Sequence, residues 1–285
     1  MIVILTVLSI VAQVMQQIFR KEYDKRSNKG EFCFSLVGVF ASLIYFIVLT
    51  GGNFSFSAEM LLYAIPFSIC YTIAYVFTMF SIKNGPLSLT SLIISCSVAV
   101  PVIFGVVALK EPVNIALILG VILLFLSVVF VAEPWRKEEM RITVKWIIYS
   151  SVTFFSNGFC MSVQKLFQIK DKGVHSNEFM VCSLILTFLS ILILVLAKER
   201  KSIRNFIKGG GIIWPVLCGA GNGIANQLTM MLAVVLPASF LYPVQSAGAI
   251  ILTAVISMLF YKERLSLVQK AGFAFGVFAI IAFNI

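Results

Sequence analysis

The stretch LKEPVNIALILG at residues 109–120 returns in altered form as YKERLSLVQKAG at residues 261–272. In each copy a Lys-Glu pair follows a long apolar run, and a glycine stands nine residues after the glutamate. The two glutamates, Glu111 and Glu263, are 152 residues apart, slightly more than half the chain. A charged motif that recurs at matching places in both halves indicates an internal duplication.

The composition of the chain is that of a membrane protein. Of its 285 residues 60% are hydrophobic and 12% are charged, against roughly 25% charged in soluble domains, and the mean hydropathy is +1.02. A net charge of +10 would suggest nucleic acid in a soluble protein. Here the basic residues lie in short loops between apolar runs, so we interpret them as topology signals and expect no nucleic-acid partner.

The apolar runs predict an all-α membrane protein with ten transmembrane helices, since a spanning helix needs about 20 mostly apolar residues. The runs are continuous rather than alternating, which argues against a β-barrel. The first run has no basic residues before it and no cleavage site after it, so we expect a retained helix rather than a signal peptide. The expected segments are residues 1–19, 32–50, 59–82, 86–109, 112–131, 143–166, 177–197, 211–234, 237–260 and 265–284.

The duplication divides the chain into a first repeat of five helices, residues 1–135, and a second, residues 136–285. Because five is odd, the second repeat must enter the membrane upside down relative to the first. Inverted repeats of this kind build carriers that work by alternating access, with the substrate held near the midplane between the repeats.

Polar side chains recur on two segments that the duplication relates. Tyr71 and Tyr75 lie on one face of the third segment, and Asn222 and Asn226 lie 151 residues further on, on the eighth. Polar groups within a bilayer usually face the protein interior or a wet cavity. We therefore predict a substrate-binding site, although such groups also simply join helices for roughly 0.6 kcal/mol each. The full set of candidates is Gln13, Gln16, Tyr71, Tyr75, Asn157, Gln164, Asn222, Asn226, Tyr242 and Gln245.

The repeated motif itself is expected to be structural. A carboxylate in a turn between helices can accept hydrogen bonds from free helix N–H groups and complement the helix dipole. We assign this role to the two glutamates in preference to proton coupling, because no Asp or Glu lies in the middle of a helix. The expected structural residues are Glu111, Glu263, Gly120 and Gly272.

Other residues allow two interpretations. Lys165 either reaches the membrane interface, which is the expected role, or contacts an anionic part of the substrate. The glycines beside Asn222, which are Gly219, Gly221 and Gly223, allow either close helix packing or flexing. The single histidine, His175, cannot form a metal site alone, and the six cysteines contain no CxxC pair. We expect no catalytic residue, no metal and no cofactor.

The ten helices, the motif GPLSLTSLIIS at residues 85–95 and the glutamate with its following glycine resemble the ten-helix EamA-type members of the drug/metabolite transporter superfamily. The resemblance implies a membrane transporter of small organic solutes, often an exporter of amino acids or related metabolites. A flippase for lipids or lipid-linked sugars on the same fold is the alternative. An enzyme would need a cluster of acidic, histidine or serine groups within the membrane, and none is present. A scaffold protein would not need the polar faces.

We expect a multi-pass protein of the cell membrane, either a monomer or a homodimer, whose partners are the bilayer and a small-molecule substrate. Ten spans place both termini on the same side. The loops of one side carry 18 Lys and Arg residues and those of the other side carry 4. The positive-inside rule then places both termini outside, whereas the resemblance implies termini in the cytoplasm.

Overall fold

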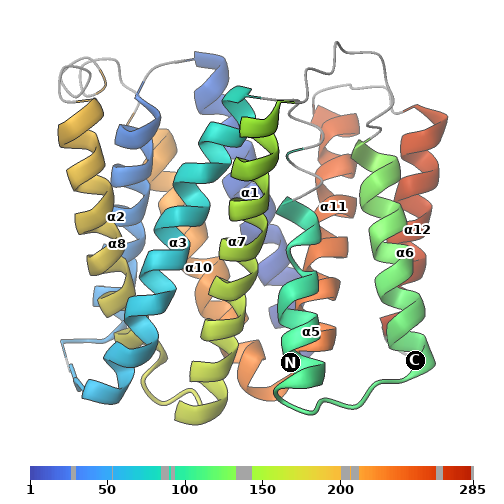
Figure 1. Ribbon diagram of the computed structural model, residues 1–285, viewed down its shortest axis with the longest axis horizontal. Coiled ribbons are helices and arrows are strands. Elements are labelled where there is room, and N and C mark those ends of the chain that lie inside the picture. The colour runs from blue at the N-terminus through green and yellow to red at the C-terminus, as the bar shows by residue number, and fades with distance from the viewer. Residues whose placement is uncertain are drawn as a thin grey trace. The chain divides into compact units, whose positions relative to one another are not determined.

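The computed structural model describes residues 1–26, 30–52, 54–84, 90, 94–132, 143–199, 206, 212–260 and 266–283. These residues form ten α-helices and no β-strand, and Figure 1 shows them. The helices are α1 (Ile2–Arg26), α2 (Glu31–Leu49), α3 (Ala58–Asn84), α5 (Ala99–Val107), α6 (Ile115–Ala132), α7 (Val144–Asp171), α8 (Ser176–Lys198), α10 (Ile213–Val235), α11 (Ala238–Phe260) and α12 (Leu267–Phe283).

The apolar runs form helices, which confirms the all-helical class. Within the described part of the chain, four stretches are long and apolar enough to cross a membrane: Ile2–Arg20, Glu31–Leu49, Ala58–Thr78 and Ser176–Lys198. Four shorter apolar stretches fall largely in α5, α6, α11 and α12. The helices α7 and α10 have 28 and 23 residues but carry more polar side chains. The number of ten spans and the inverted orientation of the repeats remain predictions.

The chain folds into two compact units. The first unit comprises residues Met1–Thr72 and Leu166–Val234, and the second comprises Ile73–Lys165 and Val235–Ile285. Each unit therefore contains parts of both sequence halves. The division of the sequence into repeats of 1–135 and 136–285 concerns ancestry rather than contacts, and it stays a prediction.

In the first unit three glycines of α10 approach α1 and α2 closely, and α2 lies beside α8 (Figure 1). A methyl group added at Gly219 would lie 2.8 Å from the Ala41 side chain and would overlap the Gly38 carbonyl group. One added at Gly221 would lie 3.2 Å from Gln16 on α1. One added at Gly223 would lie 2.6 Å from the Tyr45 ring. The glycines of α10 thus serve close packing, which is one of the two roles expected for them.

In the second unit α12 packs along α6, and α11 contacts α5, α6 and α12 (Figure 1). Gly120 and Gly272 are both buried, and each is the sixth residue of its helix, α6 and α12 respectively. They therefore occupy matching positions on two helices that lie side by side, and their structural role stays a prediction.

Candidate functional site

Polar side chains from four helices meet at Asn222 on α10, in the first unit. Its Oδ1 atom accepts hydrogen bonds from the Tyr71 hydroxyl of α3 at 3.3 Å and the Asn226 amide at 3.1 Å. The Ser42 hydroxyl of α2 donates to the same oxygen at 3.4 Å. The Asn222 Nδ2 atom donates to Gln16 Oε1 of α1 at 3.0 Å. These five residues are named the Asn222 cluster below.

The cluster is built from groups that compensate one another without any formal charge. Amides are costly in hydrocarbon unless they find partners or water. The Asn226 amide also donates to the Asn222 backbone carbonyl at 3.0 Å, and Gln16 donates to the Ala12 carbonyl at 3.4 Å. The side chains of Gln16, Asn222 and Asn226 are nevertheless only half-buried. The cluster is therefore paired internally, and these three residues are not fully buried.

The contact between Tyr71 and Asn222 joins the two residues that the sequence pattern relates by an offset of 151. Residues related by a two-fold rotation can touch only if both lie beside the rotation axis. The hydrogen bond is therefore consistent with a two-fold axis of the predicted duplication that passes beside these two residues.

The other candidates fall outside the cluster. Gln13 belongs to the first unit, on α1, and is half-buried. Tyr75 is half-buried and belongs to the second unit, because the boundary between the units lies within α3. Gln164 on α7 and Gln245 on α11 are also in the second unit, and each is only 4% exposed.

Two further candidates of the second unit form hydrogen bonds between helices. The Asn157 amide of α7 donates to the Ser97 hydroxyl at 2.6 Å. The Tyr242 hydroxyl of α11 donates to the Met161 carbonyl of α7 at 2.8 Å. Of the predicted site residues, the structure thus brings together Gln16, Tyr71, Asn222 and Asn226 in one cluster and distributes the remainder.

Sequence reasoning missed the contribution of α2. Besides Ser42, the Tyr45 hydroxyl of α2 donates to the Gln227 side chain of α10. Ser42 also donates to the Gly219 carbonyl at 2.6 Å. The spacing of three residues between Ser42 and Tyr45 places both on one face of α2 and could have indicated them. The search for polar residues repeated in both halves passed over them, because their counterparts 151 residues further on are apolar.

Glu111 caps a helix, although not the next helix along the chain. Its two carboxylate oxygens accept hydrogen bonds from the backbone N–H groups of Ala238 at 2.7 Å and Ser239 at 2.9 Å, in the first turn of α11. Lys110 before it has a left-handed backbone (φ 55°), which turns the chain after α5. A carboxylate at this end of a helix also complements the helix dipole. Glu263, the second glutamate of the motif, lies outside the described residues.

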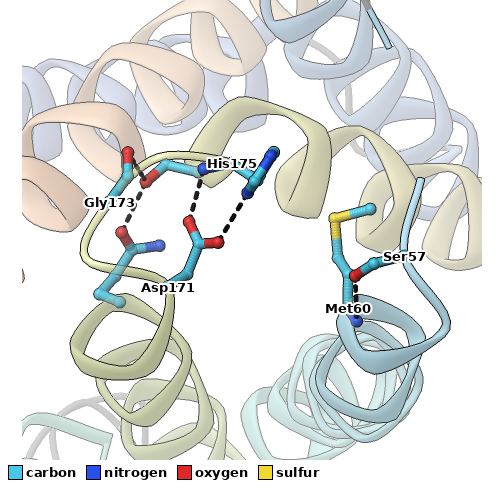
Figure 2. Close-up of polar contacts among 7 residues, drawn as sticks. Ser57, Met60, Asp171, Gly173 and His175 are labelled. Atoms are coloured by element: carbon cyan, nitrogen blue, oxygen red, sulfur yellow. Dashed lines mark hydrogen bonds and ion pairs between the residues drawn. The ribbon is translucent and has the colours of Figure 1, made fainter. Parts of the chain in front are cut away.

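The turn between α7 and α8 accounts for the single histidine (Figure 2). The His175 Nδ1 atom lies 2.7 Å from an Asp171 carboxylate oxygen, and the other oxygen accepts the His175 backbone N–H. The Ser176 hydroxyl bridges the Gln168 side chain at 2.6 Å and the Gly173 carbonyl at 3.1 Å. The hydrogen bond with the carboxylate raises the pKa of His175 above 6.5. Within the described residues no group of three His, Cys, Asp or Glu side chains could hold a metal ion.

The comparisons with known proteins agree with the fold and the resemblance. A crystal structure described only as "Crystal structure of protein" superimposes with a TM-score of 0.80, covering 99% of this chain and 98% of that chain at 11% identity. This likeness concerns the fold alone. No curated protein matches the sequence.

The family comparison covers the first part of the chain. Residues 1–132 match the family described as the EamA-like transporter family, whose members are transporters and not enzymes. This similarity and the apolar helices agree with the expectation of a multi-pass membrane transporter of small solutes. The match covers less than half of the chain, and it is a similarity that agrees with the resemblance of the motifs to the drug/metabolite transporter superfamily.

Proposed function

We propose that this protein exports or exchanges a neutral or zwitterionic organic solute, such as an amino acid or a related metabolite, by alternating access. The observation that supports this proposal is the Asn222 cluster, in which side chains of α1, α2, α3 and α10 converge on one amide. The cluster offers amide and hydroxyl groups without formal charge. Such groups recognise hydrogen-bonding solutes while imposing no requirement for a net charge.

The packing of related helices supports alternating access. In the first unit α2 lies beside α8, and in the second unit α5 lies beside α11 and α6 beside α12. In the predicted duplication these are the equivalent pairs. Equivalent helices that touch lie next to the axis relating them, and carriers with inverted repeats bind substrate at the interface between the repeats. The exchange of cluster hydrogen bonds for solute hydrogen bonds would then accompany each transport cycle.

A comparison of two tyrosine variants tests the site. Tyr71→Phe removes the hydroxyl that donates to Asn222, whereas Tyr63→Phe removes a hydroxyl two turns earlier on the same helix, outside the cluster. The loss of one neutral hydrogen bond to a solute costs roughly 0.5–1.5 kcal/mol, or about 2- to 13-fold in affinity. We expect this loss for Tyr71→Phe and not for Tyr63→Phe.

The measurement uses purified full-length protein in liposomes, with a panel of radiolabelled amino acids tested for exchange and uptake. Thermal unfolding of each variant shows whether the fold is intact. The proposed function is wrong if no member of the panel is transported by protein that is shown to be folded. The proposed site is wrong if Tyr71→Phe transports with unchanged affinity.

A further inference from the structure

Gln13 on α1 differs from the other predicted site residues in its hydrogen bonding. The nine others take part in hydrogen bonds or other polar or aromatic contacts with the remainder of the chain. Gln13 forms no hydrogen bond within the part of the chain that the structure describes. An amide is costly in hydrocarbon unless a partner or water compensates it. Water or a ligand is therefore the partner that the Gln13 amide requires.

Gln13 lies on the buried side of α1 rather than on its outer side. Ser9, four residues earlier on the same face, is 0% exposed, and Ala12 and Val14 on either side of Gln13 are buried as well. Val11 points in nearly the opposite direction, because two residues turn a helix by about 200°, and it is 39% exposed. Gln13 is nevertheless only half-buried. The buried face of α1 is therefore accessible at this residue.

The Asn222 cluster begins one turn further along the same face of α1. Gln16 belongs to it and accepts the hydrogen bond from Asn222 at 3.0 Å. The groups of the cluster are already paired with one another, whereas the Gln13 amide can bind a solute without breaking a hydrogen bond inside the protein. The cluster and residues 2–19 of α1 contain no charged side chain. A solute at Gln13 therefore receives no countercharge from these groups.

Two polar residues of α7 are less accessible than Gln13. Lys165 is only 3% exposed and donates a hydrogen bond to the Leu236 carbonyl, so the expected position at the membrane interface is not what the structure shows. The Nε2 atom of Gln168 has no partner among the described residues, but this residue is 0% exposed and its other amide atom accepts the Ser176 hydroxyl. Gln13 combines an unpaired amide with an accessible side chain.

We propose that the Gln13 amide binds an α-amino acid in its zwitterionic form, an inference that rests on the transport function proposed above and narrows its substrate class. The Oε1 atom accepts a hydrogen bond from the ammonium group of the solute, and the Nε2 atom donates one to its carboxylate. Such charge-assisted hydrogen bonds are roughly twice as strong as neutral ones. The two charges of the solute lie next to each other and offset one another, so the uncharged surroundings of Gln13 need not supply a countercharge.

The first experiment tests whether water reaches Gln13. Single cysteines replace Gln13, Ser9 or Val11 in the full chain without its native cysteines, reconstituted in liposomes. A charged, water-soluble thiol reagent should modify Gln13→Cys. The same reagent should spare Ser9→Cys, which is buried, and Val11→Cys, which lies on the outer side of α1. An uncharged, lipid-soluble reagent should modify Val11→Cys and so show that this thiol is reactive.

The second experiment measures the binding of L-amino acids and of their methyl esters, which lack the carboxylate charge, by calorimetric titration of the purified full chain. Gln13→Met keeps the length of the side chain and removes both hydrogen bonds. Loss of a hydrogen bond to a charged group weakens binding by roughly 10- to 150-fold, and we expect a loss within or above this range for the amino acid. The ester should lose less, so the preference for acid over ester should shrink. Gln227→Met, whose amide is held by Tyr45, is the matched control and should keep the preference.

The proposal is wrong if the charged reagent does not modify Gln13→Cys, if no amino acid binds to the wild type, or if Gln13→Met weakens acid and ester equally, as a merely structural role would. Binding that depends on Gln13 without any transport would support the site and overturn the proposed transport function. Transport by the wild type with unchanged binding in Gln13→Met would support the function and overturn the site. Thermal unfolding shows which variants are folded, and the reactivity of Gln13→Cys still decides if Gln13→Met does not fold.

Discussion

Replacing Gly219 by alanine tests whether the close approach of α10 to α2 holds the Asn222 cluster together. The added carbon would lie 2.8 Å from the Ala41 Cβ atom and 2.9 Å from the carbonyl carbon of Gly38, so the two helices must separate. Overpacking costs about 1–3 kcal/mol, and loss of the Ser42 hydrogen bond to the Gly219 carbonyl adds about 0.6 kcal/mol. The better helix propensity of alanine offsets about 1 kcal/mol. We expect a net destabilisation of roughly 0.6–2.6 kcal/mol by these terms.

The opposite side of the same contact supplies the control. A methyl group at Gly38 would meet only the Pro215 carbonyl oxygen at 3.5 Å, an ordinary contact. Gly38→Ala should therefore unfold at the wild-type temperature or slightly above it, while Gly219→Ala unfolds earlier. Thermal unfolding of both variants in the same detergent measures the difference. Equal unfolding midpoints, or a more stable Gly219→Ala variant, would refute the reasoning that α10 and α2 leave no room for an added methyl group at Gly219.

Three further predictions concern the helix ends. Glu111→Gln turns an N–H donor toward the N–H groups of α11, so its unfolding midpoint should fall by the equivalent of one unsatisfied donor, about 1–3 kcal/mol; Glu59→Gln at the exposed start of α3 should change little. Because the pKa of His175 is raised above 6.5 by its hydrogen bond with a carboxylate, protonation stabilises the fold fully below about pH 6.5, and this contribution disappears as the pH rises through the raised pKa. The unfolding midpoints of wild type and His175→Asn should therefore differ most in acid and converge in alkali, by a small amount because the side chain is 41% exposed. Single cysteines at Ser27 and Asn53, in a background without native cysteines, should react with an impermeant thiol reagent from opposite sides, with position 27 protected in intact cells if the positive-inside rule holds.

Helical class and membrane character were predictable from the sequence because they depend on composition and on the length of apolar runs. The bounds of α8 and α11 lie within a residue or two of the expected 177–197 and 237–260. The helix α1 runs further than expected, to Arg26, because basic residues are good helix formers and nothing before them stops the helix. Helix bounds that depend on local composition can be predicted without knowing which other helices pack against a given helix.

The composition of the candidate site was only partly predictable. Asn222 and Asn226 were found because they repeat a pattern of the other half, and their spacing of four residues leads directly to the hydrogen bond between them. Ser42 gave a weaker signal, since one serine in an apolar helix is usually uninformative and only its spacing of three residues from Tyr45 pointed to it. Glu111 was expected to cap a helix next to its own turn, whereas the helix whose N–H groups it contacts, α11, is set by tertiary packing and could not be read from the sequence.

The unequal chemistry of the two halves bears on how the proposed carrier would bind its solute. Two identical inverted repeats would bind a solute equally well in two opposite orientations. In the predicted duplication, however, the hydroxyl of Tyr71 is the counterpart of the amide of Asn222, and the two meet in one hydrogen bond. Ser42 on α2 has Ile193 as its counterpart on α8, and that side chain is 67% exposed rather than part of the cluster. The cluster is therefore chemically one-sided, so a solute with distinct polar and apolar ends should bind in one orientation, and this orientation should persist when the repeats exchange their roles.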